Sequence, residues 1–136
     1  MKIKLEPGAY VPERAHKTDA GMDIKAMLGQ RIMPHSSVVF HTGVHVELPP
    51  NRAGLLVSKS GLNINKKIVT TGLIDEGYDG EIVIRMFNHG EESYLVTAGD
   101  KISQLVVVPV EYEEIEIVDE IKSGDRGSAG FGSSGR

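Results

Sequence analysis

The chain has 136 residues, a formal net charge of −4, 40% hydrophobic and 25% charged residues, and no cysteine. These values are typical of one soluble globular domain, and the negative charge argues against a nucleic-acid partner, because binding a nucleic-acid backbone requires a basic surface. The lack of cysteine excludes disulfides and thiolate sites, no apolar run approaches the roughly 20 residues of a membrane span, and a cytoplasmic protein without a membrane partner is expected.

Apolar and polar residues alternate with a period of two along several short segments. In chain order these are Lys2–Leu5, Val44–Leu48, Glu81–Phe87 and Glu114–Ile117. Stretches rich in turn-forming residues, such as ELPPNRAG and DEGYDG, separate them. Short strands and turns at this spacing predict an all-β barrel or sandwich. The best helical candidate is a short piece around LNINKK, which begins at Leu62.

The last part of the chain differs in composition from the rest. RGSAGFGSSGR, residues 126–136, is mostly glycine and serine, which bury too little apolar surface to offset chain ordering. We therefore expect a β domain at residues 1–122 and a flexible arm at residues 123–136. Phe131 at the centre of the arm is either incidental or part of a device that closes over something.

Several familiar signatures are missing from the sequence. It contains no G-x-x-x-x-G-K-[ST] phosphate loop and no G-x-G-x-x-G that opens a helix, and GFGSSG does not fit G-x-S-x-G. An EF-hand starting at Asp75 would place Gly77 and Met86 where calcium needs oxygen ligands. The five histidines are scattered, which favours solvated positions over a metal site.

Five segments combine glycine with polar side chains at turns or strand ends. They are DAGMDIKA, SKSGLN, TGLIDEGYDGEI, AGDKISQ and RGSAGFGSSG. Each alone reads as an ordinary turn, but together and in this order they resemble the five motifs of the trimeric dUTPase family over the whole chain. The resemblance implies a distorted jelly-roll or β-barrel subunit (the β-clip, dUTPase-like fold). It also implies a homotrimer with active sites at the subunit interfaces and an arm that closes over each site.

The resemblance also implies an activity. The family hydrolyses dUTP to dUMP and pyrophosphate, which limits uracil incorporation into DNA and supplies dUMP for dTMP synthesis. Asp75 stands where the family places a base that takes the proton of the water attacking the α-phosphorus. Tyr78 matches the tyrosine that packs on the deoxyribose and leaves no room for a 2′-hydroxyl. The backbone of Gly72, Leu73 and Ile74 is expected to read the uracil.

The same resemblance suggests how the triphosphate is held. Asp23 is expected to support the phosphate region through water or an arginine. Mg2+ is expected as the cofactor, held mainly by substrate phosphates and water and by no protein side chain directly, as suits a hard ion. The remaining expected substrate contacts are Lys59, Ser60, Gly61 and Gln104 in the domain, and Arg126, Phe131, Gly132, Ser133 and Ser134 in the arm.

Three positions depart from the family pattern. Lys59 stands where arginine is usual and offers a point charge without the two-pronged guanidinium. Val69 stands where many relatives carry asparagine, so side-chain help in reading the base is in doubt. Ser103 replaces a common alanine, a small change that we expect to be tolerated.

Other functions fit parts of the pattern. A dCTP deaminase or a bifunctional enzyme shares the fold, a catalytically silent nucleotide-binding protein could use the same scaffold, and a β-sandwich module could bind carbohydrate or protein. The glycine-rich fifth motif with Phe131, together with Asp75 and Tyr78, favours the hydrolase. The absence of tryptophan leaves few aromatic platforms for carbohydrate.

Overall fold

The computed structural model describes residues 1–122 and 124, and within these residues the chain forms strands and one short helix. The all-β prediction is confirmed, and the helix lies where LNINKK predicted it. The elements are β1 (Lys2–Leu5), β2 (Gly21–Lys25), β3 (Gln30–Ile32), β4 (Ser37–Glu47), β5 (Arg52–Val57), α1 (Ser60–Lys66), β6 (Ile68–Ile74), β7 (Glu81–Asn88), β8 (Tyr94–Val96) and β9 (Lys101–Pro109).

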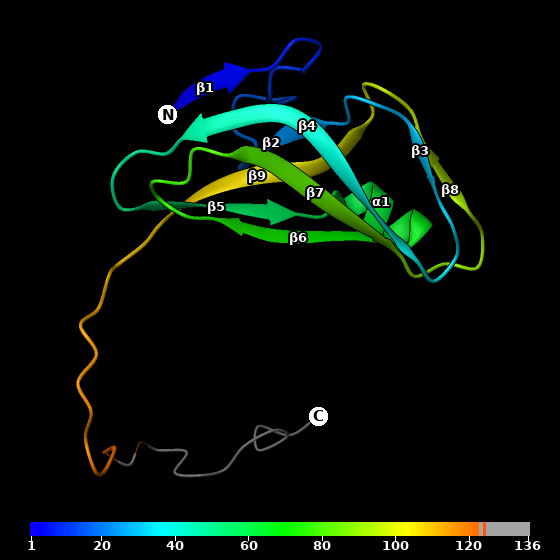
Figure 1. Cartoon of the computed structure of the whole chain (residues 1–136). Coiled ribbons are helices and arrows are strands. Elements are labelled where there is room, and N and C mark those ends of the chain that lie inside the picture. Colours follow the sequence, from blue (N-terminus) through cyan, green and yellow to red (C-terminus); the bar gives the residue numbers. More distant parts are fainter. Residues whose placement is uncertain (123, 125–136) are drawn as a thin grey trace.

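The main sheet has seven strands in the order β1-β4-β7-β6-β5-β9-β2, and β3 pairs with β8 in a separate two-stranded sheet beside it (Figure 1). Strand β6 changes partner along its length. Residues Ile68–Thr70 pair with β7, whereas Thr71–Ile74 pair with β5. The two halves of the sheet therefore diverge at Thr71, and the sheet curls around one core.

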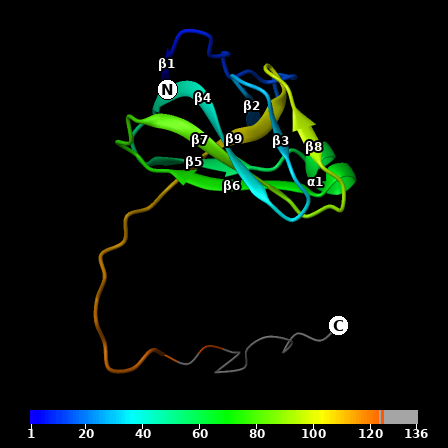
Figure 2. The same cartoon turned by 45° about the vertical axis from the view of Figure 1, so that its right-hand side comes forward.

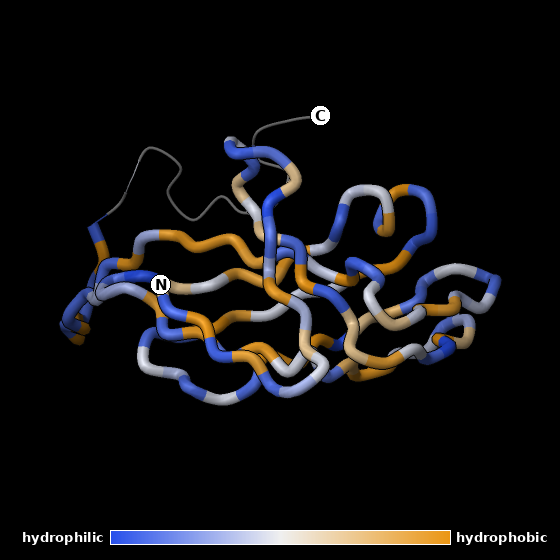
Figure 3. Tube along the Cα trace, turned by 90° about the horizontal axis from the view of Figure 1, so that it is seen from above, coloured by the Kyte–Doolittle hydropathy of each residue, from blue (hydrophilic) through white to orange (hydrophobic). Residues whose placement is uncertain are grey.

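The core is built by residues that alternate along the strands. In β7, Ile82, Ile84 and Met86 are buried while Val83 and Arg85 are exposed, as the period of two predicts. Apolar segments gather in the strands and hydrophilic ones at the turns (Figure 3). The largest fully buried apolar side chains are Ile24, Ile32, Ile68, Ile82, Ile84, Met86, Ile102, Leu105, Val44 and Val96.

A bulge in β4 lies beside the turn that connects β6 and β7. The register moves from His41 opposite Val83 to His45 opposite Glu81, so three residues of β4 face one residue of β7. At the centre of the bulge Gly43 has a φ of +64°, and a Cβ there would lie 2.6 Å from the sulfur of Met27. Only glycine meets both conditions, so the sequence permits the bulge through this one residue.

The chain beyond β9 leaves the body of the domain, as two views of the trace agree (Figures 1 and 2). The Tyr112 hydroxyl donates to Glu76 Oε2 at 2.7 Å, and Ile115 and Ile117 are 93% and 95% exposed. The strand predicted at Glu114–Ile117 is wrong for this chain by itself, because an extended segment becomes a strand only when a neighbour pairs with its backbone. No helix among the described residues is long and apolar enough to cross a membrane.

Candidate functional site

The structure divides the predicted site residues of the domain into two groups. Asp23, Lys59 and Gln104 come together, with Ser60 and Gly61 following Lys59 at the start of α1. Asp75 and Tyr78 lie in the turn between β6 and β7, at the other end of β5. The six residues of β5 that separate the groups span roughly 20 Å. The described residues of one chain therefore hold two half-sites.

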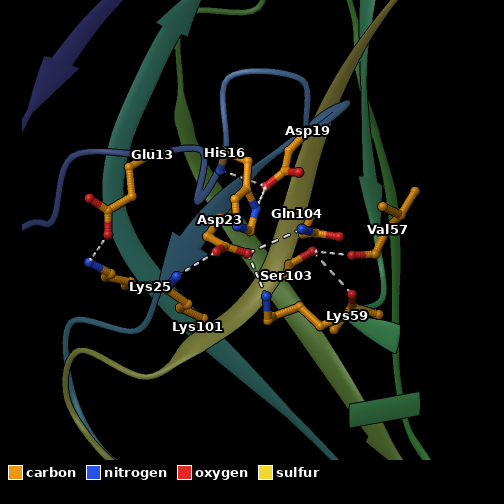
Figure 4. Close-up of polar contacts among 11 residues, drawn as sticks. Glu13, His16, Asp19, Asp23, Lys25, Val57, Lys59, Lys101, Ser103 and Gln104 are labelled. Carbon is orange, nitrogen blue, oxygen red and sulfur yellow. Dashed lines mark hydrogen bonds and ion pairs between the residues drawn. The ribbon is translucent and has the colours of Figure 1, made fainter. Parts of the chain in front are cut away.

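The first half-site is centred on the Asp23 carboxylate in β2, which is 3% exposed (Figure 4). Lys59 Nζ donates to Asp23 Oδ1 at 2.6 Å, and Gln104 Nε2 donates to the same oxygen at 3.2 Å. Lys101 Nζ lies 2.7 Å from Oδ2. The pairing of Asp23 with Gln104 across β2 and β9 places these side chains together, so the sheet register builds the cluster.

The cluster carries more positive than negative charge. Burial of Asp23 raises its pKa, but hydrogen bonds from Lys101 and Lys59 outweigh burial and hold the pKa below its ordinary value. The pKa of Lys101 is raised, mainly by its hydrogen bond to Asp23. One buried carboxylate thus fixes two partly exposed ammonium groups, which leaves a net positive half-site suited to phosphate.

Sequence reasoning missed Lys101, although it belongs to AGDKISQ, the fourth of the five segments. Period two does not point to it, because counting by twos from Gln104 along β9 reaches Ile102 and not residue 101. Lys101 is paired with Lys25, two residues beyond Asp23 along β2 but three residues before Gln104 along β9. A bulge between Ile24 and Lys25 shifts this register, and that irregularity is not visible in the sequence.

Hydroxyl groups that are buried or half-buried connect the strands near the cluster. Ser103 Oγ donates to Val57 O at 3.0 Å and lies 3.1 Å from Thr70 Oγ1. Ser58 Oγ accepts from Thr70 N at 2.8 Å and donates to Thr70 O at 3.0 Å. Ser103 is fully buried yet hydrogen-bonded, which explains how a hydroxyl is accommodated at this position.

The second half-site is a cleft between the diverging strands β6 and β7. Its volume is about 460 Å³, and Thr71, Gly72, Leu73, Ile74, Asp75, Tyr78, Val83 and Arg85 are among its lining residues. Ladder pairing between β6 and β7 within the described chain covers only Ile68–Thr70 on β6. Backbone N–H and C=O groups beyond Thr70 that face β7 therefore line the cleft, available to hydrogen-bond a flat polar ring.

Asp75 and Tyr78 stand together at the mouth of this cleft. Both side chains are exposed, and Tyr78 N donates to Asp75 O at 3.2 Å, which closes the turn. The Tyr78 hydroxyl donates to Glu81 O at 2.9 Å. Gly77, with a φ of +85°, lets the chain reverse between the two residues. The turn therefore presents a carboxylate and an aromatic ring to the same cleft.

The predicted arm contacts Arg126, Phe131, Gly132, Ser133 and Ser134 lie outside the described residues. For a metal, no group of three or more His, Asp or Glu side chains within the described part of the chain could hold an ion. Asp23 already has lysines at both oxygens. The lysine ammonium groups at Asp23 are suited to phosphate oxygens rather than to a cation.

Known dUTPases match this chain over almost its entire length. The dUTPase family model matches residues 8–135. The deoxyuridine 5'-triphosphate nucleotidohydrolase of Gloeothece citriformis is 43% identical, with 99% of this chain and 97% of the relative covered. The dUTPase of Staphylococcus bacteriophage 80alpha with dUpNHpp superposes with a TM-score of 0.93 at 34% identity, covering 99% of this chain and 98% of that one. A mutant dUTPase from S. aureus phage phi11, described with a structural Mg(II) ion, has a TM-score of 0.81 at 33% identity, covering 88% and 96%.

Proposed function

The chain belongs to the dUTPase family, and from this premise we propose that it hydrolyses dUTP to dUMP and pyrophosphate. The observation that carries the proposal is the cleft between β6 and β7, with Asp75 and Tyr78 at its mouth. The enzyme would work in the cytoplasm, where it would limit uracil incorporation into DNA and supply dUMP for dTMP synthesis.

Uracil binds along the free edge of β6 in this proposal. The backbone of Gly72, Leu73 and Ile74 offers N–H and C=O groups that can pair with the base as another base would. Glycine at residue 72 avoids a crowded contact, since a Cβ there would lie 3.0 Å from a Leu56 methyl carbon. Main-chain readout also makes an asparagine at position 69 unnecessary, and Val69 instead pairs with Phe87 in the sheet.

Asp75 is the general base. Its carboxylate is exposed at the cleft mouth, where it can orient a water and take the proton while the water oxygen attacks the α-phosphorus. The bond between the α-phosphorus and the bridging oxygen breaks, and pyrophosphate leaves with that electron pair. Tyr78 packs on the deoxyribose beside the base and excludes a 2′-hydroxyl.

Lys59, Lys101 and Gln104 hold the phosphates, with Ser60 and Gly61 at the adjoining start of α1. Asp23 acts through the lysines by fixing their ammonium groups. Mg2+ on the triphosphate would shield charge and withdraw electron density from the leaving pyrophosphate. In this proposal the ion is bound by substrate phosphates and water, because the ammonium groups of the lysine cluster do not bind a cation.

We propose that the active protein is a homotrimer with sites between subunits. One triphosphate cannot reach both half-sites of a single chain, because they lie at opposite ends of β5. A second copy must bring its lysine cluster to the Asp75 cleft. Exposed apolar side chains on that face, Val39, Val83 and Leu73, and the unpaired segment Glu114–Ile117 offer surfaces for such contacts.

The division of the chain follows from this arrangement. Residues 1–122 form the β domain, and residues 123–136 form a C-terminal arm that closes over a site. Arg126 would meet the terminal phosphates, Phe131 would stack on the uracil, and Gly132, Ser133 and Ser134 would donate to phosphate oxygens. The match of the family model through residue 135 supports including the arm in the enzyme.

The decisive experiment incubates the full chain with Mg2+ and, separately, dUTP, dCTP, UTP and dTTP. We expect dUMP and pyrophosphate from dUTP alone. Ammonia from dCTP would identify a deaminase instead, and no turnover of any nucleotide would leave only a binding protein. Light scattering in solution should give three times the 14.7 kDa chain mass, and a monomer that is fully active would contradict the shared site.

A further inference from the structure

Gly80 lies against the hydroxyl end of the Tyr78 side chain. A Cβ placed on Gly80 would lie 2.5 Å from Cζ and 2.9 Å from Cε2 of Tyr78, and closer still to the hydroxyl oxygen. The three nearest atoms to that Cβ all belong to Tyr78. The Tyr78 side chain therefore occupies the space that a side chain at residue 80 would fill.

Backbone conformation does not require glycine at this position. The glycines with positive φ are Gly8, Gly43, Gly77 and Gly99 among the described residues, and Gly80 does not belong to them. An alanine at residue 80 would thus be compatible with the backbone, and its cost would fall on the tyrosine ring. A side-chain end can move away, so we expect the fold to remain while the ring is displaced.

The other contact of the ring is also held in place. The Tyr78 hydroxyl donates to Glu81 O at 2.9 Å. The Glu81 carboxylate enters the bulge of β4, where Oε1 accepts from Gly43 N at 2.8 Å and Oε2 lies 2.7 Å from His41 Nδ1. Next along the turn, His45 Nδ1 donates to Asp79 O at 2.9 Å. The bulge thereby anchors the carbonyl that orients the tyrosine.

We propose that Gly80 is a specificity-determining residue, which seats the Tyr78 ring against the sugar site while Glu81 fixes the hydroxyl end of that ring. This inference rests on the proposed function, since Tyr78 must contact the sugar for its position to matter. A ring held by its contact with Gly80 and by the bond from its hydroxyl cannot turn aside to admit a 2′-hydroxyl. A methyl group at residue 80 would occupy the place of the phenol end, so the ring would have to swing out of this seat and would leave part of the sugar-facing space open.

The test compares Gly80→Ala with the parent enzyme, using the ratio of kcat/KM for dUTP to kcat/KM for UTP. We expect this ratio to fall roughly tenfold or more, because one methyl-sized change in a sugar pocket alters discrimination by that order. Oligomeric mass and Tm should match the parent. A Gly80→Ala protein that fails to fold would overturn the inference, because the three atoms nearest to the added methyl group belong to a movable side chain.

Tyr78→Ala and the double variant complete the cycle. Tyr78→Ala should lower the ratio, and adding Gly80→Ala to it should lower the ratio no further, because the ring is no longer there to be displaced. A ratio lowered by Tyr78→Ala but unchanged by Gly80→Ala would overturn the role of Gly80 alone. A ratio unchanged by Tyr78→Ala would overturn the sugar-excluding role of Tyr78 and the inference with it. Loss of dUTP turnover in the parent itself would instead count against the proposed function.

Tyr78→Phe tests the second contact independently of any change at residue 80. It keeps the ring over Gly80 and removes the hydrogen bond to Glu81 O. The ratio should fall, but less than in Tyr78→Ala. A Tyr78→Phe enzyme as unselective as Tyr78→Ala would show that the seat on Gly80 does not hold the ring.

Discussion

Lys59 Nζ lies 2.6 Å from Asp23 Oδ1, although the two residues are 36 positions apart in the chain. The pairing of β5 with β9, and of β9 with β2, brings them together. Asp23 is buried, whereas the two lysines that contact it are partly exposed. The carboxylate therefore orients cations that remain accessible to a ligand. The cluster should matter both for the stability of the fold and for binding.

Because Asp23 compensates two ammonium groups, Asp23→Asn should destabilise the protein. The amide cannot compensate two ammonium groups, so the loss should be about 2 kcal/mol in the free energy of unfolding, less than for a pair buried on both sides. Urea unfolding at one fixed protein concentration measures it. Glu47→Gln, which breaks the exposed pair with Lys2, should change stability by less than about 0.5 kcal/mol. Equal effects of the two changes would argue against a special role for Asp23.

Lys101→Met should raise KM for dUTP roughly tenfold, because a charge-assisted phosphate contact is lost. If the contact is equally strong in the ground and transition states, kcat should remain close to that of the parent. Lys2→Met removes an exposed lysine far along the sheet order and serves as the matched control. An unchanged KM in Lys101→Met would remove this residue from the phosphate site.

Asp75→Asn should lower kcat roughly 1,000-fold, because the amide can hold a water but cannot accept its proton. Binding of a non-hydrolysable analogue such as dUpNHpp should persist, and calorimetry can measure it. Asp79→Asn changes another exposed carboxylate of the same turn and controls for charge. Near-parental turnover by Asp75→Asn would exclude it as the base.

Gly43→Ala should lower stability by about 3 kcal/mol, since it combines a positive φ with contacts of 2.6 and 2.8 Å to Met27 and Ala9. Gly77→Ala isolates the first effect. Gly77 has a φ of +85°, but no atom lies within 4 Å of the position that an alanine methyl group would take, so a loss of only about 1 kcal/mol is expected. Chemical denaturation measures the free energy of unfolding of both variants. Equal losses would show that the atoms around residue 43 move aside and that crowding in the bulge adds no cost.

Stability should decrease as pH rises through the titration of His41 and His45. A hydrogen bond to Glu81 raises the pKa of His41 above 6.5, and hydrogen bonds to Asp79 O and Glu6 raise that of His45. Groups with a raised folded-state pKa contribute fully below the unfolded value of 6.5, and the contribution is lost as pH rises through the folded values. Tm measured between about pH 6 and about pH 9 should therefore fall with pH.

The control for this pH dependence is the double variant His41→Gln, His45→Gln. The hydrogen-bond partners of the two histidines stay in place, but the titrating rings are gone, so the slope of Tm against pH above about 6.5 should flatten. A slope that is the same in the double variant would assign the pH dependence to other groups. Enzyme activity is not needed for this measurement.

The sequence by itself predicted the class of fold and the family. Alternation in Glu81–Phe87 identified a half-buried strand because side chains along a strand point to opposite faces. The five glycine-containing segments, taken together and in order, indicated the family through their resemblance to its five motifs. Local patterns were sufficient for the strand and for helix α1.

Only the tertiary structure decided which residues meet. Alternation assigns a residue to a face but does not choose its partner strand, so the sequence could not place Lys101 on Asp23 or show β6 changing from β7 to β5 at Thr71. The same rule failed at Glu114–Ile117, where the pattern of a strand is present without a partner in the chain. Pairing depends on backbone hydrogen bonds between distant segments. These bonds place the lysine cluster and Asp75 at opposite ends of β5. The turn between β6 and β7 places Gly80 against Tyr78.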